Sequence, residues 1–161
     1  MANRKFVATG ALLLLPLFSL SATAQLKGDA AEKAVTARQA LFKQIADANA
    51  PLGAMARPGG MYNADAALKA VDTIATLAEK IPAMFEPNTA GHKQAKPGKY
   101  AANDSIWSSK ADFNKLAADL VAGAKQARET LSSQGAAGLR TALSQVGQKC
   151  GACHDRFRVD L

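Results

Sequence analysis

Cys150-Gly151-Ala152-Cys153-His154, close to the end of the chain, decides how the rest of the sequence is interpreted. The stretch has the form C-x-x-C-H, which is typical of a site for covalent attachment of a c-type haem. The two thiols add across the two haem vinyl groups, and the adjacent histidine becomes an axial ligand of the iron. Thiols three residues apart lie on one face of a helix. The stretch therefore predicts one covalent haem c per chain, with Cys150 and Cys153 as attachment points and His154 as metal ligand.

Three other interpretations of the cysteine pair were weighed against haem attachment. A thioredoxin-like redox couple belongs in a βαβ unit, and the chain shows no alternation of strand and helix. A tetrahedral zinc site would need both histidines of the chain, the distant His92 and His154, which directly follows Cys153. The third interpretation is that the cysteine pair occurs by chance in the core of a helix. Haem attachment is favoured, because the helical context described below agrees with it.

The N-terminus has the features of an export signal. A basic start precedes an apolar run at 11–20 and the stretch Ala22-Thr23-Ala24, whose small-x-small form suits signal peptidase. The run is shorter than the roughly 20 residues that span a bilayer. We therefore expect residues 1–24 to be a signal peptide cleaved after Ala24. Residues 25–161 should form one domain in the periplasm, since c-type haem is attached outside the cytoplasm.

The charge of the chain excludes some classes of partner. Removing Arg4 and Lys5 with the signal peptide lowers the formal charge from +7 to +5. A modest surplus of this kind can steer a protein toward an acidic partner or simply keep its surface solvated. Basic and aromatic residues are not interleaved as in nucleic-acid-binding surfaces. The mature sequence also has no second apolar run, so we expect no nucleic-acid binding and no membrane span.

Hydrophobic periodicity predicts four helices in the mature chain. Apolar residues recur at steps of three and four over 27–49, 64–80, 105–132 and 136–157. Segments rich in Pro and Gly separate them, including a loop at 50–62 and a long crossover at 82–104, with Pro82 ending the second helix. No strand signal is visible. The pattern predicts an all-α, antiparallel four-helix bundle with one long connection.

The last helix places the cysteines on its apolar side. Its stripe consists of Leu139, Leu143, Val146, Cys150, Cys153 and Phe157. Both thiols should therefore face the core of the bundle, as expected if a covalently attached haem forms part of that core.

Two polar residues outside the motif need an interpretation. Arg38 interrupts the apolar stripe of the first helix one turn before Phe42. It can be a snorkelling side chain at the edge of the stripe or a partner for a haem propionate, because Arg pairs well with carboxylates. Both interpretations stay open. His92, in the polar crossover, is expected to be a solvated residue.

With these features the sequence resembles the cytochrome c′ family, the class II cytochromes c, over essentially all of the mature chain. The placement of C-x-x-C-H at the C-terminus is the most specific feature. Further support comes from Arg38-Gln39, the turn at 82–89, Ile106-Trp107 followed by Phe113, and Val146-Gly147 ahead of the cysteines. The resemblance implies a left-handed four-helix bundle with one haem c, located in the periplasm and often a homodimer.

The resemblance also implies roles for residues around the haem. Cys150 and Cys153 align with the attachment points and His154 with the axial ligand. Arg38 and Gln39 align with residues beside the propionates, and Arg158 aligns with a basic residue near the proximal face.

Phe42 aligns with the residue above the distal face of the haem. Low-spin members have a methionine at this position that ligates the iron, and a phenylalanine cannot do so. The resemblance therefore implies a five-coordinate iron, unless Met55 or Met61 reaches the sixth position.

Three functions follow from these expectations. The protein can bind small gases such as nitric oxide and carbon monoxide at an apolar distal face, or it can transfer single electrons to redox partners that the sequence does not name. The alternative for the second function is a low-spin, six-coordinate carrier with a Met sixth ligand. An enzyme of the peroxidase type is the third function and ranks last, because no distal acid–base residue accompanies Phe42.

Overall fold

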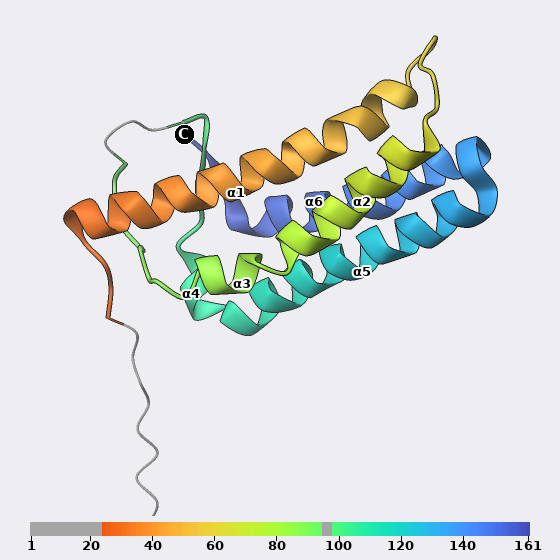
Figure 1. Ribbon diagram of the computed structural model, residues 1–161. Helices are drawn as coiled ribbons and strands as arrows, with labels where there is room; N and C mark the ends of the chain where they lie inside the picture. The colour runs from red at the N-terminus through yellow and green to blue at the C-terminus, as the bar shows by residue number, and fades with distance from the viewer. Residues whose placement is uncertain (1–23, 95–97) are drawn as a thin grey trace, which may run out of the picture.

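The chain forms a four-helix bundle, as the sequence predicts. The computed structural model describes residues 24–94 and 98–161, so the expected signal peptide lies outside the described residues apart from Ala24. Four long helices run antiparallel, each to the next (Figure 1): α1 (Gly28–Met55), α2 (Ala64–Ala78), α5 (Lys110–Gln134) and α6 (Leu139–Phe157). In the part of the chain that is described, no helix is both long and apolar enough to cross a bilayer.

The four helices do not pack equally against one another. Helix α5 contacts both α2 and α6 closely, and α1 contacts α2, whereas α1 and α6 touch only sparsely. The bundle therefore lacks one of the helix interfaces that a fully packed arrangement would have. The functional site lies between these two helices.

The first helix is longer than the sequence predicts. It continues through Pro51 to Met55, where a loop was expected from residue 50. Leu52 is completely buried and Met55 packs against the core, so tertiary contacts hold the last turn in place despite the proline. The connection to α2 is accordingly short. It needs Gly60, because a Cβ there would come within 2.5 Å of the Ala54 carbonyl oxygen.

The second helix ends earlier than predicted. It begins as expected after Asn63, whose side chain accepts a hydrogen bond of 2.8 Å from the Ala66 amide. It stops at Ala78, and Pro82 lies at the start of a separate short helix, α3 (Ile81–Met84). Proline suits a first helical turn, where an amide donor is not needed. Pro82 therefore lies in the first turn of α3, whereas the sequence predicted that it would end the second helix.

The third and fourth expected helices are each divided. Helix α4 (Ser105–Ser108) precedes α5, with Ser109 outside the helical region between them. A 3-10 turn, η1 (Gly135–Gly138), precedes α6. Gly135 has a φ of 56°, a backbone conformation that glycine adopts without strain.

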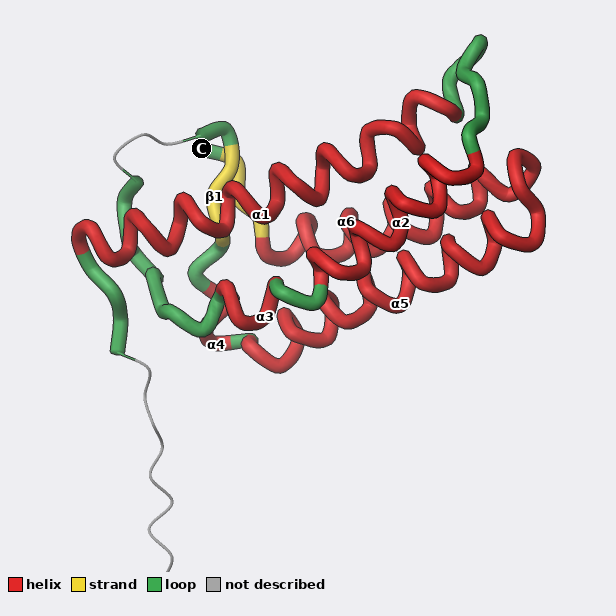
Figure 2. Tube along the Cα trace, in the orientation of Figure 1, coloured by secondary structure: helices red, strands yellow, loops and turns green. Residues whose placement is uncertain are grey.

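Two short strands were not predicted. Strand β1 (Tyr100–Ala102) in the crossover pairs antiparallel with β2 (Arg158–Asp160), directly after α6. Figure 2 shows the pair beside the C-terminus. Each strand has three residues, too few for a period-two pattern to be visible in the sequence. The crossover is therefore fastened to the end of the helix that carries the cysteines.

An aromatic cluster closes the core at this end of the bundle. The ring of Phe113 lies 4.7 Å from Phe85 and 5.4 Å from Phe157, measured between centroids. Phe85 also contacts Phe42 at 6.2 Å. The cluster joins the crossover to α1, α5 and α6 at the end of the bundle where the site lies.

Candidate functional site

A cavity of about 610 Å³ lies between α1, α5, α6 and the crossover. Its walls are largely apolar, with side chains such as Ile45, Leu120 and Val146. All seven residues that the sequence analysis assigned to a haem site line it: Arg38, Gln39, Phe42, Cys150, Cys153, His154 and Arg158. Residues more than a hundred positions apart thus meet at one cavity.

The two cysteines occupy one wall of this cavity. Both are half-buried on α6 and both are free thiols. Burial raises the pKa of the Cys150 thiol, and burial together with the nearby Cys150 raises the pKa of Cys153. Both groups are therefore neutral thiols near neutral pH. No cluster of three potential metal ligands occurs within the described ranges.

His154 follows Cys153 at the mouth of the cavity. Burial, and to a lesser extent the charge of Arg158, lower the pKa of its imidazole, while Asp155 opposes them. The imidazole is therefore neutral at neutral pH, the form in which histidine binds a metal. Nη1 of Arg158 lies 3.2 Å from Nδ1 of His154, so a guanidinium occupies the position beside that ring nitrogen.

Arg38 is buried and held by the crossover. Its side chain is 4% exposed, which excludes the snorkelling interpretation. Its guanidinium donates to the Met84 carbonyl at 2.8 Å and, at 2.6 Å each, to the Pro87 carbonyl and the Thr89 hydroxyl. The Phe85 ring lies 4.4 Å from the guanidinium carbon.

The Arg38 guanidinium still has donors to spare. Burial lowers its pKa to about 10, so it stays charged at neutral pH. Three of its five N–H groups are used by the crossover, which leaves two for another acceptor.

His92 is not simply a solvated loop residue. Its side chain is 14% exposed, it lines the cavity, and its Nε2 lies 2.8 Å from a carboxylate oxygen of Glu32. Gln39, which also lines the cavity, donates to the side chain of Gln94 at 2.8 Å. The sequence gives no signal for these pairs, because each joins α1 to the crossover across more than fifty residues.

No methionine of the described residues lines the cavity. Met61 is 88% exposed in the loop after α1. Met55 lies on the same helix as Phe42 but thirteen residues further on, about 20 Å along the helix axis at 1.5 Å per residue. Phe42 itself is half-buried and faces the cavity.

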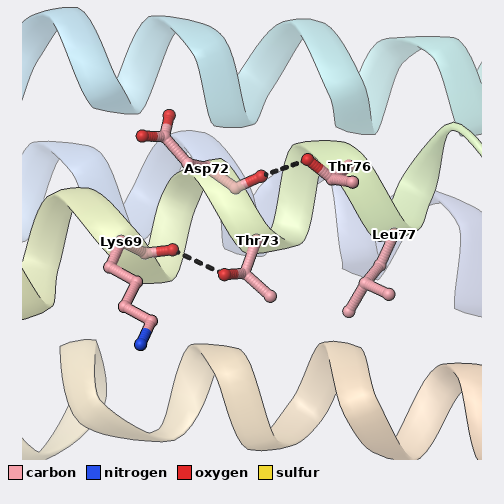
Figure 3. Close-up of a pocket in the computed structure, with 5 residues that line it drawn as sticks. All are labelled: Lys69, Asp72, Thr73, Thr76 and Leu77. Carbon is pink, nitrogen blue, oxygen red and sulfur yellow. Dashed lines mark hydrogen bonds between the residues drawn. The ribbon is translucent and has the colours of Figure 1, made fainter.

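A second depression lies on the outer face of α2, away from the cysteines. Figure 3 shows the residues that line it, Lys69, Asp72, Thr73, Thr76 and Leu77. Both threonine hydroxyls donate to carbonyl groups of their own helix, at 2.7 and 2.9 Å. Asp72 pairs with Arg128 at 2.8 Å. The two hydroxyls and the carboxylate here thus have partners within the protein, and they do not point to a ligand.

Comparison with known proteins agrees with the geometry of the cavity. The profile of the cytochrome c′ family matches residues 33–158. The chain belongs to this family. A cytochrome c-556 of Agrobacterium tumefaciens is 33% identical over 125 residues, which cover 78% of this chain and 96% of the relative. A cytochrome c′ of Rhodopseudomonas palustris is 32% identical over 127 residues, covering 78% of this chain and 81% of the relative.

Solved structures of the cytochrome c′ family share the fold of this chain. The structure of the cytochrome c′ of Rhodopseudomonas palustris superposes with a TM-score of 0.66 at 31% identity and covers 79% of this chain and 96% of its own. The cytochrome c′ of Thermochromatium tepidum superposes with a TM-score of 0.69 at 27% identity, covering 85% and 100%. The chain is therefore a c-type cytochrome, and its family implies a haem cofactor.

The cavity fits that cofactor. It has apolar walls for a porphyrin, two thiols spaced for the vinyl groups, and an imidazole next to the second thiol. Guanidinium groups of Arg38 and Arg158 also line it, and the propionates of a haem are anions.

Proposed function

We propose that this protein is a periplasmic c-type cytochrome with one haem bonded to Cys150 and Cys153 and a five-coordinate iron ligated by His154. Its function is to bind small gases, nitric oxide or carbon monoxide, and to exchange single electrons. The observation that carries the proposal is the cavity wall opposite α6, where Phe42 lies and where the described residues include no methionine.

The haem would supply a one-electron couple and an open coordination position, and the residues of the chain would control access to it. Phe42 has no lone pair for the iron and limits the size of an entering molecule. Its contact with Phe85 at 6.2 Å supports the ring. Such an apolar face offers no hydrogen bond to bound dioxygen, so it favours ligands that do not need one.

Electron exchange is supported by the position of the cysteines. Cys150 and Cys153 are only half-buried and His154 is exposed, so this edge of the site can be approached from solvent. Lys99 and Lys149 also line the cavity, which would favour a partner with an acidic surface.

Catalysis is not part of the proposal. A peroxidase-type reaction needs a distal acid–base group. Arg38 is the nearest titratable residue on the α1 stripe, and three of its N–H groups already bond to the crossover. Its role toward a haem propionate stays a proposal, which the two remaining donors permit. Replacing Arg38 with Leu should then shift the potential or its pH dependence.

Assembly and location complete the proposal. By resemblance to the family we infer a homodimer whose contact is made by α1 and α2. Analytical ultracentrifugation at high protein concentration tests this, and a monomer would contradict it. Export to the periplasm predicts a mature chain that begins at Gln25, with the mass of one haem added.

Optical spectra of the purified protein test the central proposal. We expect high-spin spectra in the ferric and ferrous states, and a new spectrum when nitric oxide or carbon monoxide is added to the ferrous protein. The haem should stay with the chain on acid–acetone extraction. A low-spin spectrum with a sulfur-to-iron charge-transfer band would show a six-coordinate electron carrier instead.

A further inference from the structure

The two strands form a clasp between the crossover and the end of α6. Tyr100 pairs in register with Asp160, and Ala102 pairs with Arg158. Hydrogen bonds extend the pairing on both sides: the Asn103 amide donates to the Phe157 carbonyl at 2.9 Å, and the Leu161 amide donates to the Lys99 carbonyl at 3.0 Å. The clasp begins at Arg158, one helical turn after His154. The strand pairing therefore fixes the backbone from which the Arg158 side chain extends.

Tyr100 and Arg158 meet within this clasp. The guanidinium carbon of Arg158 lies 4.2 Å from the centroid of the Tyr100 ring, inside the range of a cation–π contact. The same guanidinium places Nη1 3.2 Å from Nδ1 of His154. Tyrosine ring, guanidinium and imidazole thus form a continuous series, and all three side chains line the cavity.

We propose that Tyr100 is a positioning residue that holds the Arg158 guanidinium beside Nδ1 of His154 and thereby tunes the axial ligand. The inference rests on the proposed function, in which His154 binds iron through Nε2. It concerns a residue of the crossover that neither the motif nor the periodicity of the sequence singles out.

The physical consequence follows from the group next to Nδ1. A carboxylate or carbonyl at this position accepts a hydrogen bond and makes a histidine ligand more basic. A guanidinium can only donate, so beside an Nδ1 that keeps its proton when Nε2 binds iron it forms no hydrogen bond and acts through its positive charge, which favours the state of the iron with the lower charge. A fixed Arg158 should therefore weaken the bond between iron and imidazole and raise the reduction potential. An Arg158 side chain that moves freely in solvent would weaken this bond less and raise the potential less, because water screens its charge.

Without the Tyr100 ring, the exposed side chain of Arg158 would adopt many conformations. The side-chain entropy of an arginine opposes any single position at the surface. The flat Tyr100 ring restricts these conformations, and the strand pairing fixes the ring relative to α6. Tyr100 is 39% exposed, and its ring contacts two cations, Arg158 at 4.2 Å and Lys99 at 5.1 Å.

The test uses the mature, haem-loaded protein and four variants: Tyr100→Leu, Tyr100→Phe, Arg158→Leu and the double variant with both leucines. Midpoint potential and the iron–histidine stretching band in resonance Raman are measured for each. We expect Tyr100→Phe to match the unmodified protein, because the ring is retained. Tyr100→Leu should lower the potential and raise the stretching frequency, in the same direction as Arg158→Leu but by less.

The double variant decides whether Tyr100 acts through Arg158. If it does, Tyr100→Leu changes nothing further once Arg158 is gone, so the double variant matches Arg158→Leu alone. Val159→Thr, on the neighbouring position of β2, is the matched control for the clasp and should leave both readouts unchanged.

Three results would overturn the inference: additive effects in the double variant, no change in Tyr100→Leu, or an equal change in Val159→Thr. A haem assay on the unmodified protein separates these from failure of the proposed function. Covalent haem with a five-coordinate spectrum and an inert Tyr100 would refute only the positioning role. Absence of covalent haem would refute the function and the inference with it.

Discussion

Arg38 shows what a single residue contributes to this site. The sequence left two interpretations open, and the structure excludes the exposed one by burying the side chain among the crossover carbonyls and two aromatic rings. The residue joins α1 to the segment that follows α3. The charged guanidinium of Arg38 is thus a structural part of the cavity wall, and this role does not depend on a contact with a haem propionate.

Replacing Arg38 with Met should destabilise the haem-loaded protein by about 3 kcal/mol. Hydrogen bonds to a charged group contribute about 1.5–3 kcal/mol, and the change leaves the acceptors of Met84, Pro87 and Thr89 unpaired. Urea unfolding gives the free energy of unfolding. Gln44→Met is the control, because Gln44 is exposed on α1, does not line the cavity, and a surface change of this kind stays within about 0.5 kcal/mol. Equal losses in both variants would show that the crossover does not depend on Arg38.

Phe42 should decide the coordination number of the iron. Phe42→Met introduces a thioether sulfur at the cavity wall, and we expect it to convert much of the iron to low spin and to slow carbon monoxide binding. Phe42→Ala removes the ring and should speed binding. Stopped-flow mixing of the ferrous protein with carbon monoxide, followed optically, measures both. Identical carbon monoxide binding rates in the unmodified protein and in both variants would show that another part of the cavity wall forms the distal face.

At the scale of elements, periodicity predicted the existence of every long helix but only some of the helix ends. The apolar stripes of α1, α2, α5 and α6 are long enough for a 3.6-residue period to be unambiguous. Where α1 ends depends on Leu52, which is buried by the rest of the bundle, and a local signal such as Pro51 could not reveal this. The strands β1 and β2 depend entirely on pairing between distant segments.

The close contact of α5 with α6 gives a prediction at this scale. A Cβ at Gly123 on α5 would lie 2.9 Å from the backbone oxygen of Gln145 on α6, so Gly123→Ala must push the two helices apart. We expect a loss of about 1–3 kcal/mol, typical of overpacking. A change in the haem spectrum should accompany it, since Gln145 lies little more than one turn before Cys150.

Gly147 on α6 provides the matched control. A Cβ at this position meets nothing within 4 Å. Gly147→Ala should therefore stabilise the protein by about 0.5–1 kcal/mol through the higher helix propensity of alanine. Urea unfolding of the two variants is compared. A stabilised Gly123→Ala would show that α5 and α6 can move apart without strain.

At the scale of the molecule, the site arises from an incomplete bundle. The sequence located seven of the residues that line the cavity because a motif and a family resemblance marked them. It could not show that Arg38 bonds to the crossover, that His92 pairs with Glu32, or that Tyr100 meets Arg158. These contacts join segments forty or more residues apart, and only the folded chain brings them together.

The sparse contact between α1 and α6 leads to the last prediction, that the haem is a structural part of the core. Without the haem, the apolar walls of the cavity of about 610 Å³, such as Ile45, Leu120 and Val146, would be left without packing partners. The net stability of a typical domain is only about 5–15 kcal/mol, so losing this part of the core is a large change. A chain with Cys150→Ala and Cys153→Ala, freed of haem by acid–acetone extraction, should therefore lose its cooperative thermal transition while keeping part of its helical circular dichroism.

The control is the unmodified protein taken through the same extraction, which should retain its haem and unfold cooperatively. Near-ultraviolet circular dichroism of both samples follows the packing of the aromatic cluster around Phe113. A haem-free double variant that still unfolds in one sharp transition would contradict the prediction. It would mean that α1 closes onto α6 and fills the cavity with its own side chains, so the bundle would be stable without the cofactor.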